Sequence, residues 1–155
     1  MTQRAAGQYV AAMPAPTATS GLAPAPGVDY ADPLAVARGY VTARLTYRFD
    51  DPAGYTAALT APAFTTAAFA ARSTPSAAAL ARLATSQETS AVQVAGAELE
   101  GEAPNSASNR YVVVTCTVTT NYRGGGRDTA PAAWTLRLLQ APAGQWRVDG
   151  VLSTD

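Results

Sequence analysis

The sequence predicts an α+β domain in which N-terminal helices pack on a curled, mainly antiparallel four-stranded sheet. In the first half, short capping residues repeatedly precede a proline, at Asp32-Pro33, Asp51-Pro52, Thr60-Ala61-Pro62 and Thr74-Pro75. A capping side chain accepts an amide hydrogen of the first helical turn, and proline there gives up no needed hydrogen bond. In the second half, apolar and polar residues alternate with the period of two that strands require. Helices followed by a run of strands are typical of the α+β class.

The first predicted helix runs from Pro33 to about Arg48. Its apolar side chains fall at helical spacing and form one stripe, made of Leu34, Ala37, Val41 and Leu45. Three shorter helices are predicted over residues 52–59, 62–71 and 75–84. Each of them also begins at one of the prolines.

Four strands are predicted after residue 90. The first, over 91–100, changes its apolar phase at Gly96, as a β-bulge would make it do. The other three carry their apolar side chains at alternate positions, which are Val112, Val114, Cys116, Val118, Trp134, Leu136, Leu138, Trp146 and Val148. Sequential hairpins of such strands form a twisted sheet with one apolar face. The helices are the candidates to cover that face, which predicts a cone with an interior cavity.

The composition excludes several classes of function. The 155 residues carry 11 basic and 11 acidic side chains and no histidine, and every basic residue is arginine. A neutral chain gives no reason to expect direct binding to nucleic acid or to an anionic membrane surface. The absence of lysine indicates a GC-rich genome such as that of an actinobacterium. The single Cys116 lies in a strand among valines and is interpreted as a small buried hydrophobe.

Residues 1–31 are interpreted as a Pro/Ala-rich linker or the remnant of a tether, and residues 32–155 as a single domain. The stretch from Met13 to Val28 is rich in Pro, Ala, Thr and Gly, a composition typical of linkers. We expect this linker to tether the domain at its N-terminus; a natural disordered N-terminus is the alternative. The apolar run from Ala5 to Met13 is too short to span a membrane.

A glycine-rich loop extends from Tyr122 to Asp128 and carries Arg123 and Arg127. A phosphate-binding loop leads from a strand into a helix, whereas this one joins two predicted strands. We therefore interpret it as a hairpin turn whose exposed tip can contact a partner.

The acidic residues give no catalytic or metal site. Asp50 and Asp51 join two predicted helices, where capping explains them more simply than acid–base chemistry does. Glu98, Glu100 and Glu102 alternate onto one strand face, which we interpret as a solvated edge that discourages strand pairing. The sequence therefore predicts no catalytic, cofactor-binding or metal-binding residue.

Several aromatic residues can lie between the helices and the sheet. Tyr40, Tyr47, Tyr55 and Trp134 are the candidates to line the interior cavity, and the alternative is that they simply fill the core. A defined small-molecule site would need a convergent set of polar groups, and the sequence does not show one.

The chain resembles the nuclear transport factor 2-like superfamily in the order of its elements. Two short stretches add to the resemblance: the closing Gly144-Gln-Trp-Arg-Val-Asp-Gly-Val151, and the Asp-Asp-Pro turn that follows a helix carrying Tyr40 and Tyr47. The region from Arg44 to Pro52 and the linker look most like two groups of extracytoplasmic domains in it. These are the scaffold subunits of VirB-type conjugation or type IV secretion systems and the actinobacterial Mce-associated proteins. The resemblance implies a non-catalytic domain that self-associates and docks other subunits outside the membrane.

We therefore expect an assembly domain of an envelope-spanning machine, tethered on the extracytoplasmic face of the membrane. Its expected partners are subunits of a membrane-associated complex and one or two further copies of the chain. The candidate contact residues are Tyr122, Arg123 and Arg127 at the hairpin tip and Arg38, Arg44 and Arg48 on the first helix. The alternatives are a small enzyme or lipophilic-ligand binder using the cone, and a cytoplasmic stress-response domain.

Overall fold

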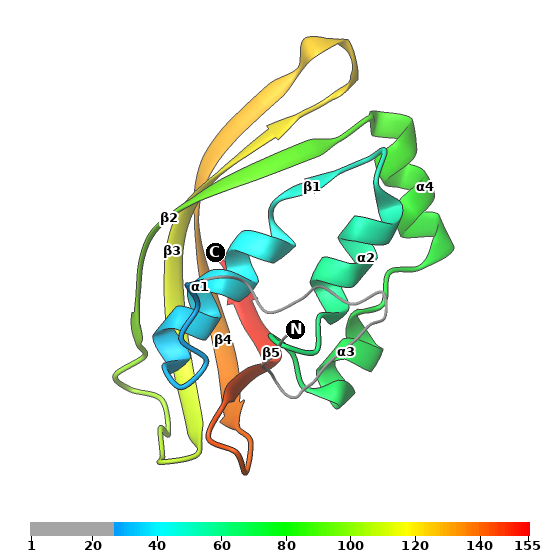
Figure 1. Ribbon diagram of the computed structural model, residues 1–155. Helices are drawn as coiled ribbons and strands as arrows, with labels where there is room; N and C mark the ends of the chain where they lie inside the picture. The colour runs from blue at the N-terminus through cyan, green and yellow to red at the C-terminus, as the bar shows by residue number, and fades with distance from the viewer. Residues whose placement is uncertain (1–26) are drawn as a thin grey trace.

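The computed structural model describes residues 27–155, so the part of the predicted linker over 1–26 lies outside the described residues. Five strands form one antiparallel sheet in the order β1-β2-β3-β4-β5. In chain order the elements are α1 (Pro33–Arg44), β1 (Tyr47–Arg48), α2 (Pro52–Thr60), α3 (Ala67–Ser73), α4 (Ala77–Ser86), β2 (Thr89–Leu99), β3 (Asn109–Asn121), η1 (Arg123–Gly125), β4 (Arg127–Gln140) and β5 (Trp146–Thr154). Figure 1 shows the sheet curling around α1, with the other helices on the same side.

The core lies between α1 and the concave face of the sheet. Helix α1 contributes Val36, Ala37, Tyr40 and Val41, all fully buried. The alternating positions predicted for the strands supply the opposite wall, where Val112, Val114, Cys116, Trp134, Leu136, Leu138, Trp146 and Val148 are buried. The predicted helix-on-sheet α+β class is confirmed.

The first helix is four residues shorter than predicted. The Leu45 amide donates to Val41 O at 3.0 Å and closes the last turn. Tyr47 and Arg48 then pair with Ser90 and Thr89 of β2, which makes a fifth strand where four were predicted. Arg48 therefore lies on a strand and not on the first helix.

Only two of the four predicted helix starts at proline are correct. Asp32 and Asp51 cap α1 and α2 through their carboxylates. The third start, at Pro62, is wrong because residues 64–66 add to the edge of β5: the Val148 amide donates to Phe64 O at 2.7 Å, and the Thr66 amide to Val148 O at 3.0 Å. Thr66 and Ser76 are the residues that cap α3 and α4.

The predicted bulge in β2 is confirmed, since the register with β3 shifts between Val94 and Gly96. The predicted row of three glutamates on that strand is wrong. Strand β2 ends at Leu99, and Glu100 and Glu102 belong to the following turn, where the Glu102 amide donates to the Glu100 carboxylate at 3.4 Å. Residues 27–155 contain no group of three His, Cys, Asp or Glu side chains that could hold a metal ion.

The segment before α1 also contacts the folded body. Val28 and Tyr30 pack against the core, and the Trp146 amide donates to Tyr30 O at 2.8 Å. Val28 and Tyr30, which fall within the predicted linker, thus contact the domain. Among the described residues, no helix is long and apolar enough to cross a membrane.

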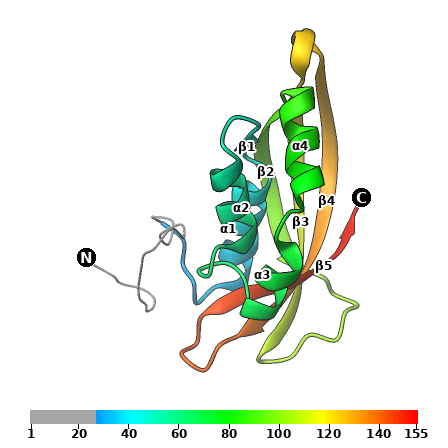
Figure 2. The same cartoon turned by 90° about the vertical axis from the view of Figure 1, so that its right-hand side faces the viewer.

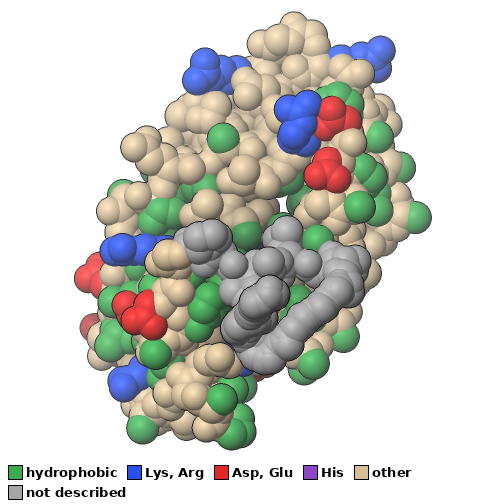
Figure 3. Space-filling view, viewed as in Figure 1, with side chains coloured by type: hydrophobic (Ala, Val, Ile, Leu, Met, Phe, Trp, Pro, Cys, Tyr) green, Lys and Arg blue, Asp and Glu red, His purple; other side chains and the backbone are tan. Residues whose placement is uncertain are grey.

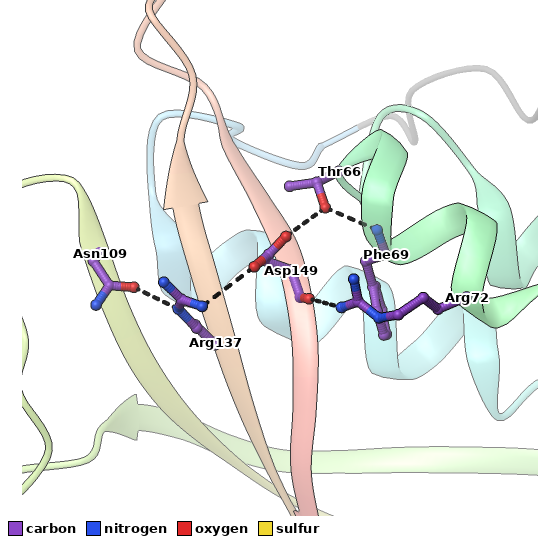
Figure 4. A network of polar contacts seen from close by, with 6 residues as sticks. All are labelled: Thr66, Phe69, Arg72, Asn109, Arg137 and Asp149. Atoms are coloured by element: carbon purple, nitrogen blue, oxygen red, sulfur yellow. Dashed lines mark hydrogen bonds and ion pairs between the residues drawn. The ribbon is translucent and has the colours of Figure 1, made fainter.

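Asp149 joins α3 to the sheet from an irregular position of β5, where the register with β4 shifts (Figure 4). Its carboxylate accepts from Thr66 Oγ1 at 2.7 Å and from Arg137 Nη1 at 3.5 Å. Its backbone oxygen accepts from Arg72 Nη2 at 2.8 Å. The Asp149 side chain is only 18% exposed, so the two bonds of its carboxylate are partly shielded from water, whereas the Arg72 bond is exposed. One side chain therefore fixes both the start of α3 and the adjacent strand.

Replacing Asp149 tests this role. Asp149→Ala leaves the Thr66 hydroxyl without its acceptor and the Arg137 guanidinium with Asn109 alone, and we expect a loss of about 2 kcal/mol in the free energy of unfolding. Urea denaturation measures it. Asp149→Asn retains an acceptor for Thr66 and should lose less. Asp50→Ala, which breaks an exposed ion pair with Arg48, is the control and should leave the midpoint unchanged. Equal midpoints for Asp149→Ala and the unmodified chain would contradict the role.

Candidate functional site

Polar and aromatic side chains gather on the concave side of the sheet, between α1, β1, α2 and the start of β2. We call them the inner cluster, which consists of Tyr40, Arg44, Tyr47, Tyr55, Glu88, Ser90 and Trp134. It includes all four aromatic residues predicted to line the cone. It also includes the polar residues Glu88 and Ser90, which no sequence pattern marked as site residues.

Arg44 is held by aromatic rings. Its Nη1 donates to Tyr40 Oη at 3.2 Å, and its Cζ lies 5.1 Å from the centroid of the Trp134 ring. A guanidinium over an indole is a favourable cation–π arrangement. Within residues 27–155 the ion pairs join Arg48 to Asp50 and Arg137 to Asp149, so Arg44 is half-buried without a carboxylate.

Tyr47 connects β1 to the start of β2. Its phenol donates to the Glu88 carboxylate at 2.8 Å, and its ring meets Tyr55 edge to face with centroids 5.0 Å apart. Burial, followed by the hydrogen bond and the charge of Glu88, raises the pKa of Tyr47 well above its usual range. Burial also raises the pKa of Tyr40, and the nearby Arg44 opposes this shift. Both phenols therefore keep their protons at physiological pH.

Ser90 is the polar side chain of the cluster that lacks a hydrogen bond. It is 7% exposed, it pairs with Tyr47 across the sheet, and its hydroxyl makes no hydrogen bond of good geometry with residues 27–155, although it lies close enough to the Tyr47 phenol to lower the pKa of that group slightly. A buried hydroxyl without a partner costs free energy. No sequence pattern marks this residue, because serine at a strand position is ordinary.

Cys116, the one thiol of the chain, is buried on the same face of the sheet. Burial raises its pKa, which favours the thiol over the nucleophilic thiolate. The inner cluster thus offers hydrogen-bond donors and aromatic surfaces around Arg44, together with one carboxylate that is already bound to Tyr47.

The hairpin between β3 and β4 carries the second candidate site. It turns through Arg123–Gly125, where Gly124 and Gly125 adopt positive φ, and the Tyr122 amide donates to Gly126 O at 2.8 Å. Every residue from 121 to 131 is exposed. Figures 1 and 2 show this tip projecting past the end of α4. The structure thus confirms the predicted hairpin turn and brings Tyr122, Arg123 and Arg127 together at an exposed end.

The three arginines predicted as a contact group on the first helix do not share one surface. Arg38 is exposed on α1, Arg48 is exposed on β1, and Arg44 points into the inner cluster. On the face seen in Figure 3, charged side chains are scattered rather than gathered in one patch. The hairpin tip is therefore the better defined of the two predicted contact sites.

No family model and no curated protein matches the chain. A solved nuclear transport factor 2-like protein involved in plasmid conjugation matches 79% of this chain with a TM-score of 0.53 and 11% identity. The chain spans about half of that protein, 47% of its length. The intermembrane space region of the chloroplast protein ARC6 matches 76% of this chain and 92% of its own, with a TM-score of 0.45 and 8% identity. The fold is nuclear transport factor 2-like, as the sequence predicted.

The raised pKa of Tyr47 predicts a loss of stability in alkali. The unfolded phenol ionises near its ordinary pKa of about 10, while the folded one keeps its proton, so the stabilisation is complete below that pH and falls above it. The difference in unfolding free energy between the natural chain and Tyr47→Phe should therefore shrink from roughly pH 9 to pH 11.5. Urea denaturation at each pH measures it.

Glu88→Gln is the matched variant for this series. It keeps an acceptor for the Tyr47 hydroxyl and removes the charge that opposes ionisation, so its stability should fall less steeply in alkali than that of the natural chain. A constant difference between the natural chain and Tyr47→Phe across the series would show that the phenol titrates alike in both states.

Proposed function

We propose that this chain is a non-catalytic assembly domain of an envelope-spanning machine for conjugative DNA transfer or type IV secretion. It acts through protein–protein contacts on the extracytoplasmic face of the membrane, where an N-terminal tether holds it. Its partners are other subunits of a membrane-associated complex.

One observation carries the proposal: the described domain has the fold of a nuclear transport factor 2-like protein involved in plasmid conjugation. Fold alone does not fix function. What favours assembly over the enzymatic uses of the fold is that Glu88, the carboxylate of the inner cluster, already accepts the hydrogen bond of the Tyr47 phenol.

The hairpin tip supplies the contact surface. Arg123 and Arg127 are exposed, and neither has an ion pair with another described residue. Tyr122 between the strand and the turn is 37% exposed and adds an aromatic ring. Arginine and tyrosine are enriched among the residues that dominate binding energy at interfaces. A tip that lies beyond the helices can reach a partner without any change in the body of the domain.

A ligand-binding function for the cone is the second candidate. Two observations favour it, namely the half-buried Arg44 without a carboxylate and the buried Ser90 hydroxyl without a partner. An apolar molecule with a polar group could satisfy both. Thermal stabilisation of the purified chain by a lipid or polyketide library, lost in Arg44→Met, would favour this function over assembly.

The assembly proposal predicts which variants lose their partners. In fractionated host cells, the natural gene product should be recovered in the membrane fraction together with transfer or secretion subunits. The double variant Arg123→Glu, Arg127→Glu should lose those subunits, because reversing two exposed charges at an interface places like charges opposite each other. Affinity capture with mass spectrometry measures the recovery.

Arg82→Glu is the control for this capture. Arg82 is exposed on α4 and not on the hairpin, and the same charge reversal there should leave the captured subunits unchanged. Recovery of the natural protein as a soluble molecule without partners would overturn the assembly proposal. Recovery of the same subunits with the double variant would support the assembly function but contradict the assignment of the contact surface to the hairpin tip.

A further inference from the structure

One edge of the sheet carries unpaired backbone groups along most of its length. Strand β2 lies at this border of the sheet (Figure 1). Among residues 27–155, β1 pairs with Thr89 and Ser90 of β2, and no strand pairs with the outer side of β2 from Ala91 to Leu99. The longer part of this edge therefore has room for an added strand.

A hydrogen bond beside β1 shows which backbone groups of the first half of β2 point outward. The Phe49 amide donates to Glu88 O at 2.9 Å, on the outer side of the sheet. The backbone groups of successive residues alternate between the two sides of a strand. Counting in steps of two from Glu88, the amide and carbonyl groups of Val92 and Val94 also point outward.

A second hydrogen bond fixes the other half of the strand. The Glu100 amide donates to Tyr111 O of β3 at 2.8 Å, so the groups of Glu100 point inward and those of Leu99 and Ala97 point outward. The bulge in β2 supplies the one extra residue that joins the two halves. We call these outward backbone groups the free edge, which consists of Val92, Val94, Ala97 and Leu99.

The opposite edge of the sheet is protected in ways that β2 is not. Residues 64–66 and Tyr30 bond to β5, and the register of β5 with β4 shifts twice. Strand β2 contains no proline, and Glu98, near one end, is its one charged residue. Natural proteins cover or interrupt strand edges because an exposed edge is a template for another strand. An edge left unprotected in a chain that protects its other edge is suited to strand addition.

We propose that the free edge binds an extended segment of a partner protein, which adds to β2 as a further strand. An extended segment presents donors and acceptors at the same two-residue repeat as the free edge, and main-chain hydrogen bonds provide the affinity. The added strand runs antiparallel to β2, as β1 and β3 do. This site is separate from the hairpin tip and does not rest on the proposed assembly function.

The side chains around the free edge define the chemistry of the segment. Val92, Val94 and Ala97 pack against the core and are partly exposed, so apolar side chains at alternate positions of the segment extend the concave packing. Glu98 and Glu100 make no ion pair with another residue of 27–155. The N-terminal end of an antiparallel segment lies beside these two carboxylates. The segment therefore carries arginine or lysine near its N-terminus.

A defined peptide tests the free edge without any other subunit. The probe is a synthetic peptide of about eight residues, which spans the free edge at about 3.3 Å per residue. It has arginine at its N-terminus, followed by alternating threonine and valine. Amide hydrogen exchange of the full chain, followed by NMR, measures the contact. The four free-edge amides should exchange fast in the chain alone and at least about tenfold more slowly with the peptide. The inward amide of Gln93 should change little.

Two altered peptides separate strand addition from apolar adsorption. A peptide with N-methyl groups on alternate amides keeps every side chain but cannot donate those hydrogen bonds, so it should bind at least about tenfold more weakly. A peptide with glutamate in place of arginine should also bind more weakly, because Glu98 and Glu100 repel it.

Variants of the chain provide the matching test. Val94→Pro removes one outward donor at an edge position where proline is tolerated, and should weaken peptide binding at least about tenfold. Val94→Thr retains the donor and the branched side chain and should bind as the natural chain does. Val92→Pro is the second variant in case Val94→Pro unfolds, which circular dichroism would reveal.

Three results would overturn the proposal. One is a peptide that leaves the free-edge amides unprotected, and another is equal binding by the N-methylated peptide or by a folded proline variant. The third is a chain that sediments alone as a dimer with these amides already protected, because a second copy then occupies the edge. None of these results bears on the capture of subunits that tests the assembly function.

Discussion

The packing of α1 into the concave face of the sheet is the contact on which the rest of the structure depends. A curled sheet exposes a broad apolar face unless a helix fills it, and α1 fills it with Tyr40 and three small apolar residues. Gly39 on the same helix allows the Phe64 ring to approach, since a Cβ at that position would lie 2.6 Å from Phe64 Cε1. The residues that cover the edge of β5 are thus fixed by the same helix that fills the cone.

Parts of both sheet edges are covered by backbone bonds, and proline protects a further part. Residues 64–66 and Tyr30 bond to the outer edge of β5, and β1 covers the start of β2. On β4, Ala133 exchanges two hydrogen bonds with Asp155, at 2.7 and 2.9 Å, so its backbone groups point to the β5 side. Pro131 lies two residues earlier and presents its nitrogen to the same side without a hydrogen. Proline at such a position discourages pairing with a foreign strand.

Local signals predicted the elements whose cause is local. The carboxylates of Asp32 and Asp51 cap helices through residues close to them in the sequence, so distant parts of the chain do not affect this signal. The alternation of apolar and polar residues around Cys116 indicates a strand with one buried face in any sheet. The prediction failed at Pro62, where the nearby Thr66 pairs with Val148, more than eighty residues away. Tyr47 was likewise predicted in a helix but lies on a strand, because its backbone pairs with Ser90 and its hydroxyl donates to Glu88. The inner cluster could be predicted in its aromatic members, which are large, but not in Ser90, which matters only through its burial.

The residues that pack on the concave side of the sheet and the residues predicted to contact partners are almost entirely different. Of the six predicted contact residues, Arg44 alone belongs to the inner cluster, and the other five are exposed. Surface side chains can therefore change while the concave packing is retained. That division accounts for a fold shared with a conjugation protein at 11% identity. Under the proposed assembly function, specificity is carried by exposed side chains such as Arg123 and Arg127 of the hairpin tip, which can change without disturbing the concave packing.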